Sequence, residues 1–266
     1  MDRSRLRRIE GRHNPLLREL RRAFTQAELT PDGYCAVEGM RIIEEAIRSG
    51  LRFKAAFFGS SAEDKACKLL PQLSNHVETV LLPDKLFAAS VPTETPQGVA
   101  ALVRWKVSSL EDVLGKASEG PLLALFGIQD PGNLGTILRS AEAFNAGGVL
   151  LGEGTVSPMN SKVVRASAGS VFRIPLAKAD LTEAVEPMKQ RGLRLLATSS
   201  HKGQELLKAD LVGPLVIFIG SEGAGLPHNL IAKMDQVIAI PHSPQVESLN
   251  AGVAASIVLY EVARRR

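Results

Sequence analysis

The chain of 266 residues is poor in aromatic side chains, which make up 5% of it, and it has two cysteines. Its composition therefore gives no indication of a platform on which the bases of a single strand would stack. Cys35 and Cys67 are too few for a disulfide framework or a metal cluster, so we expect them to be core residues. No grouping of His, Cys and carboxylate residues predicts a metal site.

Long apolar runs are also missing. None approaches the about 20 residues that a membrane-spanning helix needs. The first residues are charged and no apolar stretch follows them, so we expect no secretory signal. Hydrophobic residues still make up 45% of the chain, enough for a large core. We therefore expect a cytoplasmic globular protein of one large or two small domains.

Positive charge is concentrated at the ends of the chain. Residues 1–22 contain eight arginines against three acidic residues, a net charge of +5, whereas the whole chain has +4. Residues 264–266 are three more arginines, which leaves the middle acidic. A basic arm suits a phosphate backbone, because each neutralised phosphate releases a counterion. The alternative is a solvated, frayed terminus.

Strand and helix periodicities alternate along both halves of the chain, which predicts an α/β fold. In the first half we expect helices over 14–24, 39–48, 62–70 and 84–89, and strands over 34–37, 53–58, 76–82 and 98–103. In the second half we expect strands over 122–126, 149–151, 193–198, 215–220 and 237–240, and helices over 134–145, 161–168, 181–190 and 251–262, with a further short element over 171–175. Ser, Gly and charge over 106–120 predict a linker between domains at 1–105 and 121–266.

A first candidate loop opens the second half. A Pro-Gly turn follows its first strand, and Asn133 is a suitable cap for the next helix. Gly135 and Arg139 are four residues apart and share a helix face, so the glycine leaves room beside the guanidinium. In that position Arg139 can grip a phosphate or a developing oxyanion. The alternative is a surface ion pair with Glu142 or Glu153.

A second candidate loop, Gly-Ser-Glu-Gly-Ala-Gly-Leu over 220–226, directly follows an apolar strand. Glycines at the carboxyl end of a buried strand let a ligand approach the backbone. The order G-x-x-G-x-G is not the dinucleotide-binding G-x-G-x-x-G, and no Walker Gly-Lys-Ser/Thr follows. A nicotinamide-dependent oxidoreductase is therefore disfavoured. A turn alone does not need Glu222, so we expect this residue to serve a site.

A third candidate loop, residues 241–250, joins an apolar strand to a terminal helix that is apolar on nearly every side. We expect that helix, with Val253, Ile257 and Val258, to be buried. A polar loop between a buried strand and a buried helix is a site candidate. The alternative is an ordinary turn in which Ser248 is the helix N-cap.

These three loops resemble the three motifs of the SpoU, or TrmH-type, RNA 2′-O-ribose methyltransferases. The motif-like segments are Asn133–Ala141, Phe218–Leu226 and Ile240–Asn250, in the order and at the spacing of the family. Residues 1–105 are similar to the SpoU substrate-binding domain. Pro244 stands where many members have glycine; this departure removes no polar group and affects only loop detail and subfamily.

The resemblance implies an α/β fold whose C-terminal domain contains a trefoil knot, and a homodimer formed through that knot. It also implies that S-adenosylmethionine binds in a bent shape, mostly through backbone groups. Carried over to this chain, the cofactor-binding residues are Thr198, Gly220, Ile240, Ser248 and Leu249, with Ala197 and Ser221 as weaker candidates.

The implied reaction moves a methyl group from a sulfonium to a ribose 2′-hydroxyl, and no metal is needed. In the family the motif-one arginine, here Arg139, takes or shares the hydroxyl proton. Because a guanidinium pKa exceeds about 12, we favour a positioning and electrostatic role for Arg139. The resemblance implies that the other catalytic residues, Asn133, Glu222, Ser248 and Asn250, orient the reactants by hydrogen bonds.

The N-terminal extension resembles that of the ribosomal RNA members of the family. We therefore expect an RNA partner, with 23S ribosomal RNA favoured and transfer RNA as the alternative. A relative that binds RNA without catalysis is a further alternative, against which the intact polar residues of the three motifs argue.

Overall fold

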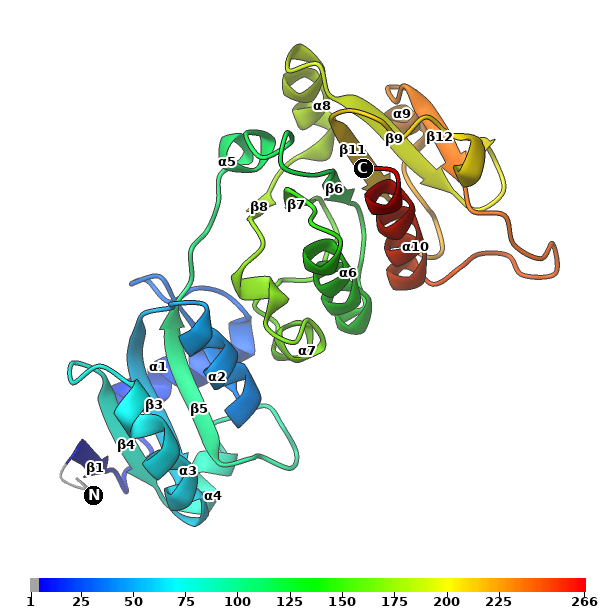
Figure 1. The fold of residues 1–266 in the computed structure, drawn as a ribbon. Coiled ribbons are helices and arrows are strands. Elements are labelled where there is room, and N and C mark those ends of the chain that lie inside the picture. The colour runs from blue at the N-terminus through cyan, green and yellow to red at the C-terminus, as the bar shows by residue number, and fades with distance from the viewer. Residues whose placement is uncertain (1–4) are drawn as a thin grey trace. The chain divides into compact units, whose positions relative to one another are not determined.

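The computed structural model describes residues 5–266, which form two compact units (Figure 1). One unit comprises the described residues up to Lys106 together with Ser157–Phe172, and the other comprises Val107–Val156 and Arg173–Arg266. In the part of the chain that is described, no helix is both long and apolar enough to cross a bilayer. Nor do three metal-ligating side chains gather anywhere within 5–266.

The first unit is built on a mixed five-stranded sheet in the order β1-β4-β3-β5-β2, in which β5 is antiparallel to both of its neighbours. Its strands are β1 (Leu6–Arg8), β2 (Tyr34–Glu38), β3 (Phe53–Gly59), β4 (Glu78–Leu82) and β5 (Val99–Arg104). Its helices include α1 (Pro15–Gln26), α2 (Met40–Arg48), α3 (Glu63–Leu69) and α4 (Asp84–Ala88). All eight elements predicted in this half are present. Strand β1 was not predicted, because a Leu-Arg-Arg strand has no apolar pattern.

A segment from the second half of the sequence packs with the first unit. It contains α7 (Ser161–Ala166), whose Arg165 donates a hydrogen bond to the Thr93 hydroxyl at 3.3 Å. That hydroxyl donates to Glu38 at 2.7 Å, and burial raises the pKa of Glu38. Ser157–Phe172 was expected in the domain at 121–266, but it belongs to the first unit. The linker expected at 106–120 stays a prediction.

The segment predicted as a linker is not a plain spacer. It forms α5 (Leu110–Leu114), because Ser109 and Asp112 make a capping box at its start. Val113 and Leu114 of this helix are buried in the core of the second unit.

The second unit has a seven-stranded sheet in the order β10-β12-β9-β11-β6-β7-β8, with every pair parallel. Its strands are β6 (Leu122–Leu125), β7 (Gly148–Leu151), β8 (Leu176–Lys178), β9 (Arg194–Ser199), β10 (Gln204–Glu205), β11 (Leu215–Ile219) and β12 (Gln236–Ala239). Besides α5, its helices include α6 (Pro131–Ala143), α8 (Leu181–Gln190), α9 (His228–Ile231) and α10 (Ala251–Arg264). The trefoil knot implied by the resemblance stays a prediction.

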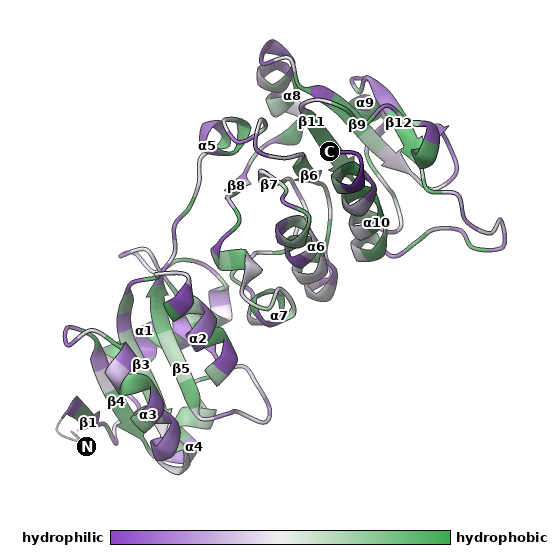
Figure 2. Ribbon diagram, viewed as in Figure 1, coloured by the Kyte–Doolittle hydropathy of each residue, from purple (hydrophilic) through white to green (hydrophobic). Residues whose placement is uncertain are grey.

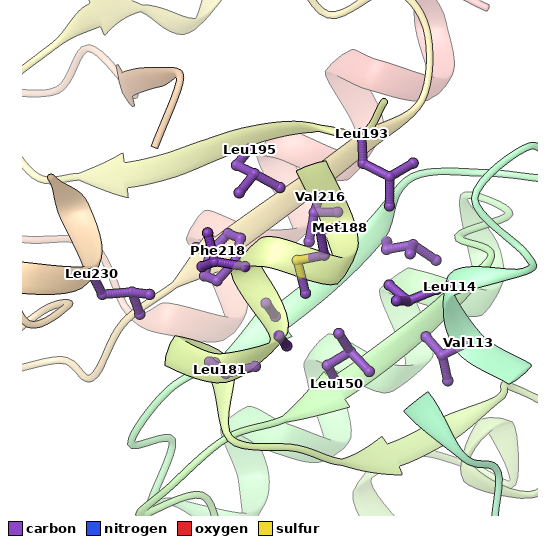
Figure 3. Close-up of a cluster of buried hydrophobic side chains, with 14 of the residues drawn as sticks. Val113, Leu114, Leu150, Leu181, Met188, Leu193, Leu195, Val216, Phe218 and Leu230 are labelled. Atoms are coloured by element: carbon purple, nitrogen blue, oxygen red, sulfur yellow. The ribbon is translucent and has the colours of Figure 1, made fainter. Parts of the chain in front are cut away.

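Both faces of the parallel sheet are covered, and its inner strands are correspondingly apolar (Figure 2). On one face α8 places Leu181 and Met188 against Leu150 and Phe218 of the sheet (Figure 3). Separately, α6 and α10 pack side by side, and Ser140 and Ser256 hydrogen-bond between them at 2.6 Å. The sheet therefore forms the middle layer of the unit.

Helix α10 is only partly buried, which corrects the expectation for it. Val258 and Val262 are buried, whereas Val253 is 47%, Ile257 36% and Tyr260 55% exposed. An apolar pattern shows that a face avoids water, but it does not distinguish a face covered by the same chain from one left for another chain.

Arginine side chains attach the C-terminal end of α10 to the rest of the second unit. Glu261 accepts hydrogen bonds from Arg264 and Arg265, which lower the pKa of its carboxyl to about 2. Arg265 also donates to backbone carbonyls of the segment after β10, at Leu206 and Ala209. Glu261 thus orients Arg265, whose hydrogen bonds attach the end of α10 to the segment after β10.

We expect Glu261→Gln to lower the thermal unfolding midpoint at pH 7. A carboxyl whose folded pKa is depressed, here from 4.5 to about 2, stabilises the fold above pH 4.5 and loses that effect as the pH falls through this interval. Calorimetry should therefore show the gap between variant and wild type closing between pH 4.5 and pH 2. A gap that does not change with pH would mean that the ionised carboxylate contributes nothing.

Candidate active site

The first candidate loop follows β6 and leads into α6. The N-cap of α6 is Asp130, whose carboxylate accepts the Asn133 backbone N–H at 2.8 Å. This corrects the prediction that Asn133 caps the helix. Since Asp130 satisfies the exposed N–H, the Asn133 side chain is available for other partners.

The second candidate loop makes a tight turn after β11. Ser221 and Gly225 exchange two backbone hydrogen bonds of 3.2 and 3.0 Å. Gly225 has a φ of +66°, which favours glycine. A Cβ on Gly220 would lie 2.2 Å from the Gly225 carbonyl carbon, so no side chain fits there.

Asn133, Glu222 and Asn250, which come from three different loops, form one hydrogen-bonded cluster. The side-chain amide of Asn133 donates to Oε1 of Glu222, and that of Asn250 donates to the same oxygen at 3.0 Å. Asn250 also donates to Oδ1 of Asn133 at 2.8 Å. We call these three residues the Asn–Glu–Asn cluster.

Asn250 also begins α10. Its Oδ1 accepts the Val253 backbone N–H at 3.2 Å, which makes Asn250 the N-cap and corrects the alternative that Ser248 has this role. One side chain therefore fixes the start of α10 and joins that start to the turn after β11.

Of the two cavities that the motif loops line, the larger, about 580 Å³, lies at the carboxyl ends of β9, β11 and β12. It is lined by all five residues expected to bind the cofactor, Thr198, Gly220, Ile240, Ser248 and Leu249. Ser221 also lines it, whereas Ala197 is fully buried and does not. Glycines, serines, a threonine and apolar side chains line this cavity, so the residues present fit S-adenosylmethionine.

Two histidines of this cavity were not predicted. His201 follows β9 and His242 follows β12, and their rings stack with centroids 4.9 Å apart. Nδ1 of His242 lies 2.7 Å from the Ile240 carbonyl oxygen, whereas its Nε2 is buried without a hydrogen-bond partner among the described residues. The sequence contained a signal by which they could have been predicted. Both histidines follow apolar strands, and the carboxyl ends of such strands share one edge of a parallel sheet.

The smaller cavity, about 320 Å³, lies between the residues that follow β6 and those that follow β11. These strands are neighbours at the point where the strand order changes direction, which is where open parallel sheets bind ligands. Asn133 and Glu222 line this cavity. Glu222 also lines the larger cavity, so it stands in the wall between the two.

The structure does not bring Arg139 to this cluster. Arg139 is exposed on α6 and lines neither cavity. It has no hydrogen-bond or ion-pair partner within the described residues, so the alternative of an ion pair with Glu142 or Glu153 is wrong. Glu142 instead pairs with Arg173.

Comparison with known proteins places the chain among RNA methyltransferases. Residues 121–260 match the SpoU rRNA Methylase family, and residues 14–101 match the MRM3-like substrate binding domain. The chain is 30% identical to the 23S rRNA (guanosine(2553)-2′-O)-methyltransferase RlmP of Bacillus subtilis, over 97% of this chain and 99% of that one.

Solved structures agree with this placement. An AdoMet-bound rRNA methyltransferase from Sinorhizobium meliloti has a TM-score of 0.83 at 27% identity, with 98% of each chain covered. A TrmH/SpoU tRNA modifying enzyme from A. aeolicus has a TM-score of 0.51 at 26% identity, over 59% of this chain and 80% of that one.

The family match covers more than half of the chain, and the match to RlmP runs nearly from end to end. The three motifs converge on one edge of a parallel sheet, beside a cavity that fits S-adenosylmethionine. The chain therefore belongs to the SpoU rRNA methylase family of S-adenosylmethionine-dependent RNA 2′-O-ribose methyltransferases.

Proposed function

We propose that this protein methylates a ribose 2′-hydroxyl of 23S ribosomal RNA. The supporting observation is that the likeness to a relative named for 23S rRNA runs through 97% of the chain. The likeness to the tRNA modifying enzyme covers 59% of it. Transfer RNA is the alternative substrate. A cytoplasmic location, expected from the sequence, accords with either RNA.

In this proposal the larger cavity binds S-adenosylmethionine, which supplies an electrophilic methyl group on its sulfonium. The backbone at Gly220, Ile240 and Leu249 holds it, with Thr198 and Ser248 beside it. The Thr198 hydroxyl donates to the Phe218 carbonyl at 3.0 Å, which keeps β9 and β11 in register beneath the cavity. The Asn–Glu–Asn cluster orients the ribose next to this cavity.

We also propose a homodimer formed through the second unit. The exposed apolar face of α10, with Val253, Ile257 and Tyr260, suits a second copy of the chain. Helix α6 packs against α10, so a copy docked on α10 would bring its own Arg139 close to that interface. Each site would then use the arginine of the other copy, which accounts for its distance from the cluster in one chain. Light scattering should give twice the chain mass of 28.5 kDa.

Ribose-methylation mapping tests the substrate. RNA from a strain lacking the gene is compared with RNA from the same strain after complementation. We expect one 2′-O-methyl nucleotide to be missing from 23S rRNA in the deletion strain and restored on complementation. A missing methyl group in transfer RNA would support the alternative, and unchanged RNA would overturn the proposal.

The basic arm is largely folded within its described residues. Strand β1 pairs with β4, and Arg5 donates to the backbone carbonyls of Leu70 and Ser74. The frayed-terminus alternative is therefore wrong for residues 5–22, whereas Arg3 lies outside the described residues. Arg8 and Arg12 are exposed, and their side chains have no partner within 5–266. We propose that they contact RNA phosphates.

We expect Arg8→Ala combined with Arg12→Ala to weaken the salt dependence of RNA binding. Each lost phosphate contact lowers the slope of log affinity against log salt by about 0.7 to 0.9, so the pair should flatten it by roughly 1.5. Preference between RNAs should hardly change, because phosphate contacts do not specify sequence. Arg48→Ala, at an exposed arginine paired with Glu45, is the matched control. An unchanged slope in the double variant would exclude these two contacts.

A further inference from the structure

We propose that Oε2 of Glu222 accepts the proton of the ribose 2′-hydroxyl during methyl transfer. This inference rests on the proposed function and names the group that activates the nucleophile. A ribose hydroxyl is a poor nucleophile at neutral pH, so a proton acceptor in the site accelerates its attack. A guanidinium is a poor acceptor, because its pKa above about 12 keeps it protonated.

The two cavities limit the choice of acceptor. In the proposed function the methyl group starts in the larger cavity, and we assign the ribose to the smaller one, so the acceptor stands at their common wall. That wall consists of Ser221–Ala224 and Ala251, and within it Glu222 is the titratable residue. Asp130 lines the smaller cavity alone, and its carboxylate caps α6. The histidines and Glu247 line the larger cavity alone.

The hydrogen bonds of Glu222 divide its carboxylate into two different oxygens. Oε1 accepts from the side chains of Asn133 and Asn250 and from the Ala251 backbone N–H at 3.4 Å. Oε2 has no partner within the described residues. Three donors on one oxygen fix the carboxylate and leave the other free to accept.

The proton and charge balance of this step is complete. The 2′-hydroxyl proton passes to Oε2 as the ribose oxygen bonds to the methyl carbon. The carbon–sulfur bond breaks, and its electron pair stays on sulfur, which becomes a neutral thioether. The carboxylate becomes a carboxylic acid that later releases its proton to water. The positive charge on sulfur and the negative charge on Glu222 are thus lost together.

Glu222→Gln separates proton transfer from positioning. The amide oxygen can still accept the three hydrogen bonds made to Oε1, while the NH₂ group replaces Oε2 and accepts no proton. Single-turnover methylation of ribosomal RNA from the deletion strain, at saturating RNA and labelled cofactor, should slow about 100-fold or more. A rate within a factor of three of wild type would mean that Glu222 only positions the asparagines, and would overturn the inference.

Ligand affinities test, without any methyl transfer, whether Glu222 stands beside the sulfonium. S-adenosylmethionine carries a sulfonium charge that S-adenosylhomocysteine lacks, and a carboxylate about 5 Å away should favour the charged ligand by roughly 4-fold even at the dielectric constant of water. Measured by calorimetry, the affinity of Glu222→Gln for S-adenosylmethionine should be lower than that of the wild type by at least this factor. Its affinity for S-adenosylhomocysteine should be unchanged. An unchanged ratio of the two affinities, or loss of both, would overturn the inference.

The matched control is Glu153→Gln. Glu153 is exposed in the loop after β7, at the same sheet edge, and lines a separate cavity there but neither of the two that the motif loops line. This variant should keep the methylation rate and both affinities. If wild type itself transfers no methyl group to ribosomal RNA, the proposed function fails. If the wild type is active and Glu222→Gln methylates the RNA at the same rate, this inference is wrong and the proposed function stands.

Discussion

Arg139→Ala should reduce methyl transfer by about 100-fold or more and leave the affinity for S-adenosylmethionine within a factor of two. In the proposed dimer Arg139 is a donor aimed at the developing charge in the other copy's site, and such a donor contributes about 10²- to 10³-fold to the rate. The side chain lines neither cavity and has no partner within the described residues, so its loss removes nothing that holds the cofactor. Calorimetry and turnover on one sample decide this. Parallel loss of affinity and activity would mean a structural role.

A mixed dimer tests whether the arginine acts across the interface. Arg139→Ala and Asn133→Ala should each be inactive alone. If each site uses the arginine of the other copy, a heterodimer of the two variants has one complete site and should recover up to about half of the wild-type activity. If the arginine acts within its own chain, the same heterodimer has no complete site and stays inactive.

Arg139→Lys keeps the charge but loses the planar fork of the guanidinium, so it should restore little of the activity that Arg139→Ala loses.

Gly220→Ala should remove measurable cofactor binding and lower the thermal midpoint by several degrees. The added Cβ would lie 2.2 Å from the Gly225 carbonyl carbon and 2.4 Å from the Leu226 nitrogen. Both are backbone atoms of a hydrogen-bonded turn and cannot swing aside, so the whole turn must shift. Overpacking of this kind costs about 1 to 3 kcal/mol. The turn forms one wall of the cofactor cavity, so the cavity is expected to change shape with it.

The same turn contains the control. A Cβ on Gly223 would meet nothing within 4 Å, and its φ is not in the left-handed region. Gly223→Ala should therefore unfold at the wild-type midpoint. Calorimetric melting and cofactor titration of both variants separate the two cases. Wild-type behaviour of Gly220→Ala would show that close packing at this turn is not required.

Elements with strong local patterns could be predicted from the sequence. Helix α8 was expected over 181–190 and is observed at Leu181–Gln190, because Asp180 caps it and its apolar residues repeat at the helical period. Strands β8 and β10 were missed, and the short element expected over 171–175 is a 3-10 helix at Ser170–Phe172 that ends before β8 begins. The two strands have three and two residues, too short for any period to appear, and their pairing depends on the neighbours β7 and β12.

The sequence by itself determined that the protein has an α/β fold, which three loops carry its polar site residues, and which family it resembles. These properties follow from local periodicity, from turn chemistry and from short motifs. Only the tertiary structure decided that Asn133, Glu222 and Asn250 meet, that one oxygen of Glu222 stays free, and that Arg139 stands apart. Asn133 and Asn250 are 117 positions apart, and their contact exists because a parallel sheet gathers the carboxyl ends of its strands at one edge. Strand order sets that arrangement, and strand order depends on how distant segments pack, which no local pattern encodes.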